Sequence, residues 1–187
     1  ARRMPQGAHW LNFCLGRSCS RCMRLWLPLV MLLVAGCAAA PATECGGTYH
    51  LHASMKAEDV APVRAAFAKW NALAGHEVAR LEEGDPDDTT CSVRLDETTG
   101  DHLGLWSHSD GSIALSPERM RTSAPRCYAA MDDCVEATMM HELGHGLGLG
   151  HVPEAPAVMA SEGMLVLEFR DADLAECARA GVCSPAR

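Results

Sequence analysis

Apolar side chains recur along the chain at two different periods, and the longer period predicts helices. Between 57 and 73 they recur at the 3.6-residue spacing of an amphipathic helix, with Phe67 and Trp70 as its largest members. A second helix is expected over 132–147, and a third, also amphipathic, over 171–180. Each should bury one face against the rest of the protein.

The shorter period, in which apolar and polar side chains alternate, predicts β-strands. The stretches with this pattern are 47–55, 78–81, 91–95, 103–108 and 112–116. Asp110-Gly111 separates the last two stretches and is a favoured turn sequence, so these two strands should form a hairpin. His102 and His108 flank the first strand of that hairpin, and we expect them at the surface or in a substrate groove rather than on a metal.

The first 37 residues have the pattern of an export signal instead. Arginines precede an apolar run over 25–34, which is too short to span a bilayer comfortably and is followed by Ala-Gly-Cys at 35–37. Cys37, directly after these small residues, resembles the lipidated cysteine of a bacterial lipobox. The alternative is an ordinary secretory signal cut near Ala40. Both alternatives predict export.

This pattern divides the chain into three parts. Residues 1–36 are expected to be a signal peptide. Met23 is a possible translation start, with 1–22 as an upstream over-extension, and Met4 is the other candidate. Residues 37–46 would form a lipidated tether, and 47–187 one folded domain. We expect a bacterial membrane-anchored lipoprotein, periplasmic or at the cell surface, or otherwise a secreted protein.

Charge is distributed unevenly between these parts. The chain has 16 basic and 24 acidic residues. Five arginines and no acidic residue precede Cys37, so the balance from there onward is 16 − 5 − 24 = −13. A body this acidic is a poor ligand for nucleic acid or for an anionic membrane surface. We therefore expect no nucleic-acid partner, and membrane attachment only through lipid on Cys37. We also expect a monomer.

Cysteine usage agrees with export. Of the 10 cysteines, three lie in or before the signal and one is the candidate lipid site. The remaining six are Cys45, Cys91, Cys127, Cys134, Cys177 and Cys183. An even number in an exported domain indicates three disulfides, although the sequence leaves their connectivity open. Proximity favours Cys127–Cys134 and Cys177–Cys183, which would leave Cys45–Cys91.

The strongest chemical signal lies at the end of the second predicted helix. His141 and His145 stand four residues apart, so both imidazoles project from one helical face, at a spacing that suits one Zn²⁺ ion. Glu142 borders that position and is suited to deprotonating a water molecule. His151 can be the third ligand if the chain reverses at Gly148, because glycine accepts the positive φ of a sharp turn. The alternative is a glycine-rich helix end with incidental histidines.

These residues form the pattern H-E-x-x-H-x-x-G-x-x-H, and Met159 follows the last histidine at the distance of a Met-turn. The chain therefore resembles the metzincin zinc endopeptidases, most closely the matrixin-like branch. The resemblance implies an α+β fold in which a twisted mixed sheet of about five strands packs with an active-site helix, a packing helix and a C-terminal helix. It also implies that 103–108 is an edge strand, which pairs with an extended peptide substrate.

The resemblance assigns roles to individual residues. One catalytic Zn²⁺ ion would be held by His141, His145 and His151, with Glu142 as general base and Met159 as the floor beneath the metal. The sequence departs from the family in three ways. It shows no inhibitory cysteine switch or propeptide before the domain, and no structural-zinc or calcium loop. Ala160-Ser161-Glu162 follows the Met-turn in place of the usual Pro and Tyr.

Two functions are consistent with these features. The first is an exported zinc-dependent endopeptidase that hydrolyses peptide bonds in a peptide or protein substrate, using a water molecule activated by Glu142. The second is a zinc-containing surface lipoprotein that binds a protein partner without cleaving it. A general base beside the metal favours the first, because a binding module has no need of one.

Overall fold

The computed structural model describes residues 45–84, 90–97, 99–122, 131–162 and 166–184. These belong to a unit that extends over Ala39–Arg187. The predicted signal peptide and lipidation site Cys37 lie outside the described residues. No helix in the described part of the chain is long and apolar enough to cross a membrane.

One mixed sheet contains five strands in the order β2-β1-β3-β5-β4. The strands are β1 (Thr48–Leu51), β2 (Arg80–Glu83), β3 (Ser92–Leu95), β4 (Gly104–Trp106) and β5 (Ile113–Leu115). β1 is parallel to β2 and β3, and β3 is parallel to β5, whereas β4 is antiparallel to β5. The predicted hairpin and the predicted edge position of its first strand are therefore both confirmed.

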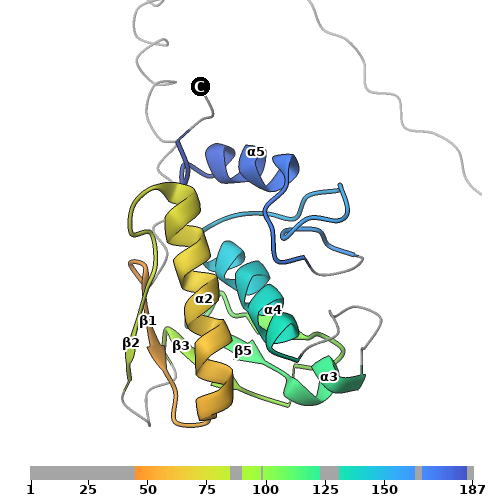
Figure 1. Cartoon of the computed structure of the whole chain (residues 1–187). Coiled ribbons are helices and arrows are strands. Elements are labelled where there is room, and N and C mark those ends of the chain that lie inside the picture. Colours follow the sequence, from red (N-terminus) through yellow and green to blue (C-terminus); the bar gives the residue numbers. More distant parts are fainter. Residues whose placement is uncertain (1–44, 85–89, 98, 123–130, 163–165, 185–187) are drawn as a thin grey trace, which may run out of the picture. The chain divides into compact units, whose positions relative to one another are not determined.

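Two long helices lie side by side next to the sheet, as Figure 1 shows for α2 and α4. α2 (Ala57–Ala74) ends at Gly75, whose φ of 76° is left-handed. α4 (Met131–Gly146) carries the histidine motif, and α5 (Asp171–Arg179) is the C-terminal helix. All three predicted helices are confirmed, and so is the predicted α+β class.

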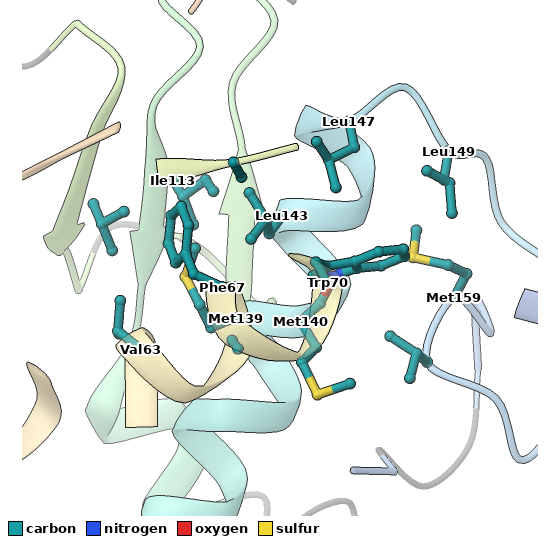
Figure 2. Packing of buried hydrophobic residues seen from close by; sticks show 14 of the residues in the cluster. Val63, Phe67, Trp70, Ile113, Met139, Met140, Leu143, Leu147, Leu149 and Met159 are labelled. Carbon is teal, nitrogen blue, oxygen red and sulfur yellow. The ribbon is translucent and has the colours of Figure 1, made fainter. Parts of the chain in front are cut away.

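The core lies where α2 meets α4 (Figure 2). Val63, Phe67 and Trp70 of α2 are buried, as are Met139 and Met140 of α4. The Nε1–H group of Trp70 donates a hydrogen bond of 2.9 Å to the carbonyl oxygen of Met140. This bond satisfies the only polar atom of the largest core side chain, and it fixes the position of α2 along α4.

Disulfides join parts of this domain as predicted in two cases. Cys45 is bonded to Cys91, which ties the residues before β1 to those before β3, and Cys177 is bonded to Cys183 at the end of α5. The predicted Cys127–Cys134 pair lies outside the described residues, because Cys127 is not among them.

Three details of the secondary structure differ from the prediction. The strand expected over 47–55 ends at Leu51, because the chain turns there and the N–H of Met55 donates to the carbonyl of His52 at 2.9 Å. The strand expected over 78–81 begins two residues later, because the side-chain oxygen of Asn71 accepts the N–H groups of Val78 and Ala79 at 2.8 and 3.1 Å. These residues are therefore held in a loop. A helix α3 (Pro117–Thr122) was not predicted. It is too short for a 3.6-residue period to be visible in the sequence.

Candidate metal centre and cleft

Three histidine side chains meet at the end of α4. The Nε2 atom of His145 lies 3.2 Å from that of His141 and 3.1 Å from that of His151, and the third distance is 3.3 Å. Nitrogen ligands about 2.0–2.1 Å from a tetrahedral Zn²⁺ ion stand about 3.3 Å apart. The triangle therefore has the dimensions of three ligands around one zinc. Among the described residues, this is the only group of histidine, cysteine and carboxylate side chains that could hold a metal ion.

The other ring nitrogens orient two of these imidazoles. Nδ1 of His141 lies 2.7 Å from the carbonyl oxygen of Val158, and Nδ1 of His145 lies 3.0 Å from that of Leu149. A carbonyl can only accept, so the proton is on Nδ1 and the Nε2 lone pair faces the centre. Burial lowers the pKa of His141 to about 4 and also lowers the pKa of His145. Both side chains are therefore neutral near pH 7, as metal ligands must be.

His151 reaches the centre because α4 stops abruptly. Leu149 donates its N–H to the carbonyl of Gly144, and Gly148 donates to that of His145, both at 2.9 Å. This is the Schellman arrangement, in which the chain reverses through a left-handed residue. Gly148 supplies that residue, with a φ of 90°. The predicted reversal is confirmed, and it brings the chain back towards the exposed His151.

Glu142 lies between α4 and the edge strand β4. It is 8% exposed, and its Oε2 atom accepts the N–H of Trp106 at 2.9 Å. Burial raises the pKa of Glu142 to about 7, even though the hydrogen bond from Trp106 opposes part of this rise. The carboxylate is consequently poised to take up and release a proton near neutral pH.

Gly104 allows β4 to lie close to Glu142. A Cβ atom at position 104 would be 2.7 Å from Cγ2 of Thr138 and 2.8 Å from Cγ of Glu142. Sequence reasoning missed Gly104 and Trp106 as parts of the site. The glycine was the available signal, because a glycine inside a strand often marks a close approach of other atoms.

An open cavity of about 770 Å³ adjoins the three imidazoles. It is lined by β4 and its flanks, by the histidine motif and by Arg179 at the end of α5. His102 and His108 both line it, in agreement with the predicted groove position. A second cavity of about 120 Å³ shares Gly104 and Glu142 with the first and is lined further by Asp101, Thr138, Ser161 and Glu162.

Met159 is fully buried near the metal centre. A Cβ atom at Gly144 would lie 2.3 Å from the sulfur of Met159 and 3.0 Å from Cζ2 of Trp70. Figure 2 shows the Met159 sulfur beside the indole of Trp70. The predicted Met-turn residue therefore packs directly against the helix that carries His141 and His145.

Asp173 supports this turn from α5. Its side chain is fully buried, and its carboxylate accepts the N–H groups of Val158, Met159 and Arg170 at 3.0, 2.8 and 2.8 Å. Val158 is also the residue whose carbonyl faces His141. The sequence indicated only a possible helix cap at Asp173. Its role toward the turn at 158–159 depends on tertiary contacts.

The chain is similar in sequence to a metalloendoproteinase. No known family pattern matches the chain. The Metalloendoproteinase 1-MMP of Arabidopsis thaliana is 32% identical over 126 residues, which are 56% of this chain and 32% of that protein. This chain thus matches about a third of the length of the plant protein. A solved structure of a zinc-dependent peptidase from Methanocorpusculum labreanum superimposes with a TM-score of 0.45 and 15% identity, over 70% of this chain and 99% of that one.

Proposed function

We propose that this protein is a zinc-dependent endopeptidase. The observation that carries the proposal is the triangle of Nε2 atoms, with edges of 3.1–3.3 Å, at the wall of an open cavity that also contains Glu142. Two of these imidazoles, those of His141 and His145, are oriented by backbone carbonyls so that Nε2 faces the centre, which fits a Zn²⁺ ion. The similarity to a plant metalloendoproteinase supports the same function.

In this proposal His141, His145 and His151 hold the ion. Bound Zn²⁺ would supply a Lewis acid that polarises the scissile carbonyl and lowers the pKa of the attacking water. Glu142 takes a proton from that water and returns it to the leaving amine. Its hydrogen bond from Trp106 fixes the carboxylate at the cavity wall, and its burial lets it hold or release a proton near pH 7.

Edge strand β4 would bind the substrate. In the described part of the sheet no strand lies beyond β4, and Leu105 is 46% exposed on it. An extended peptide adds to such an edge through main-chain hydrogen bonds. A peptide at β4 would cross the cavity next to Glu142, because the Trp106 amide joins the strand to that carboxylate. This geometry supports a peptide as the substrate.

We propose further that the protein is exported and anchored by lipid at Cys37. The two disulfides support export, because disulfides persist in oxidising compartments and are rare in the cytosol. Labelling of growing cells with a radioactive fatty acid tests the anchor. Incorporation that is lost in Cys37→Ser supports it, and equal incorporation in both proteins would refute it.

The test of the enzymatic proposal uses a broad peptide library and the zinc-loaded protein. We expect cleavage that a zinc chelator abolishes and that restored zinc recovers. Glu142→Gln should bind zinc with unchanged stoichiometry and lose at least about 100-fold in kcat, because general-base catalysis contributes about 10²–10⁴-fold.

A matched control is Glu83→Gln, which removes an exposed carboxylate that pairs with Arg64, away from the cavity. It should cleave like the wild type. Stoichiometric zinc without cleavage of any peptide would instead favour a lipoprotein that binds a partner through the cleft. Normal cleavage by Glu142→Gln would remove Glu142 from the mechanism.

A further inference from the structure

A guanidinium group lies at one side of the large cavity. Arg179 is the last residue of α5, and among the described residues that line this cavity it is the only lysine or arginine. Glu142 is the only carboxylate in the same lining. The catalytic mechanism proposed above does not use Arg179.

Arg179 is held in place relative to the metal centre. Its Nε–H donates to Oε2 of Glu176 at 2.5 Å, and its Nη2 donates to Oε1. Glu176 in turn accepts the N–H of Gly150 at 2.7 Å, and Gly150 directly precedes His151. The guanidinium is therefore tied, through one carboxylate, to the segment that presents the third histidine.

Within this ion pair the cation is the accessible partner. The side chain of Glu176 is 12% exposed, whereas that of Arg179 is 65% exposed. Glu176 uses Nε and Nη2 of the guanidinium, so Nη1 can donate to a ligand. A planar fork held by one carboxylate is well suited to a second, because less side-chain entropy is lost on binding.

The surroundings of Arg179 favour an anion there. The other ionisable side chains of the cavity lining are imidazoles and one carboxylate, Glu142, whose Oε2 atom accepts the N–H of Trp106. The smaller cavity differs, because Asp101 and Glu162 both line it. Asp101 is paired with Arg119 at 3.2 Å, whereas Glu162 has no ion-pair partner among the described residues. A substrate carboxylate thus meets a cation in the cavity lining on the Arg179 side and carboxylates on the other.

We propose that Arg179 is a specificity-determining residue that binds a carboxylate of the substrate on the His151 side of the metal centre. The proposal rests on the peptidase function proposed above. The carboxylate has two possible sources in a peptide, an aspartate or glutamate side chain and the free C-terminus. Both offer two oxygens to the guanidinium.

The experiment compares peptides that differ only by Glu or Gln at one position, scanned along the chain and blocked at both ends. The readout is the ratio of kcat/KM for the Glu peptide over its Gln partner. We expect a ratio of about 5 at one position in the wild type, the upper range for a solvent-accessible ion pair. Arg179→Gln should bring this ratio to about 1, and Arg179→Lys should give an intermediate value.

The matched control is Arg121→Gln. Arg121 pairs with Glu118 across the same three-residue helical spacing, outside the cavity lining. Its ratio should equal that of the wild type. Because each ratio is taken within one protein, a general loss of activity through a disturbed α5 leaves it unchanged. An ion pair that only stabilises α5 would therefore give the same ratio with and without Arg179.

A second arm identifies the source of the carboxylate. If peptides with a free C-terminus are cleaved about fivefold faster than their amides, and only when Arg179 is present, the chain end is the ligand. Cleavage by the wild type with no Arg179-dependent preference in either arm would overturn the proposal while leaving the peptidase function intact.

A third arm covers failure of the peptidase function itself. If no peptide is cleaved, binding of the zinc-loaded protein to an array of the same Glu and Gln peptides replaces the rate. Tighter binding to Glu peptides that is lost in Arg179→Gln would support the carboxylate site without peptidase activity. Equal binding to both series would overturn the carboxylate site as well.

Discussion

Replacing Asp173 by asparagine tests whether α5 positions the metal centre through the turn at 158–159. The two side chains have the same shape, but the amide nitrogen of asparagine cannot accept a hydrogen bond. In the native protein, Oδ2 accepts the N–H groups of Val158 and Arg170, and Oδ1 accepts that of Met159. If the amide oxygen takes the Oδ2 position, the Met159 N–H faces another donor.

The expected loss follows from these bonds. A buried donor left without a partner costs about 1–3 kcal/mol, and a hydrogen bond to a charged acceptor contributes about 1.5–3 kcal/mol. One bond is lost and two are weakened, so Asp173→Asn should lower the free energy of unfolding by about 2–4 kcal/mol. That is a large part of the roughly 5–15 kcal/mol of a typical domain.

The metal centre should respond as well, because the Val158 carbonyl accepts from Nδ1 of His141. Loss of such a supporting partner typically weakens metal binding about 10–100-fold. Urea unfolding of the metal-free protein measures the first effect, as a lower midpoint with an unchanged slope. Competition with a chelator measures the second.

Asp171→Asn is the matched control, because Asp171 lies in the same first turn of α5 but is exposed. Its unfolding free energy should stay within about 0.5 kcal/mol of the wild type. Zinc affinity and stability of Asp173→Asn equal to those of the control would refute the view that Asp173 positions the turn at 158–159.

Three further predictions concern buried groups around the centre. Burial raises the pKa of Tyr49 to about 12. The folded protein therefore keeps a proton that the unfolded chain loses above about pH 10. The free energy of unfolding should consequently fall by about 2–3 kcal/mol between pH 10 and 12. Urea unfolding of Tyr49→Phe should show a smaller fall, and an identical fall would contradict the assignment. Gly144→Ala should destabilise the fold by about 1–3 kcal/mol, because the added methyl group would overlap with the Met159 sulfur. In a thermal unfolding experiment, the double variant Gly144→Ala/Met159→Ala should recover part of the stability that Gly144→Ala loses. A Gly144→Ala protein as stable as the wild type would contradict this reasoning. Because the pKa of buried Glu142 is raised to about 7, the metal-free wild type should lose about 3 kcal/mol relative to Glu142→Gln as the pH rises from about 4.5 to 7. A pH-independent difference between these two proteins would show that Glu142 is not buried as described.

Much of the centre follows from local spacing in the sequence. His141 and His145 share a face because they are four residues apart on one helix, and Gly148 ends that helix because it accepts a φ of 90°. The long helices follow in the same way from the period of their apolar residues. These features depend on neighbours along the chain, so no knowledge of the fold is needed to predict them.

Other features depend on residues that only folding brings together. Trp106 meets Glu142 across 36 positions, and Asp173 meets Val158 across 15. Nothing in the residues around Asp173 or Arg179 marks either as part of the centre, because an acidic residue early in a helix and a basic residue late in one are common for local reasons.

The sequence by itself thus determined the three longer helices, the strands in outline and the spacing of the histidine motif. For the disulfides it only favoured pairs by proximity and left the connectivity open. The tertiary structure decided which other groups lie around the centre: the peptide N–H that orients Glu142, the carboxylate that accepts the N–H groups of Val158 and Met159, and the guanidinium in the lining of the same cavity. The physical reason is that helix and turn propensities act over a few residues. Hydrogen bonds between elements depend instead on how whole elements pack, which no local pattern records.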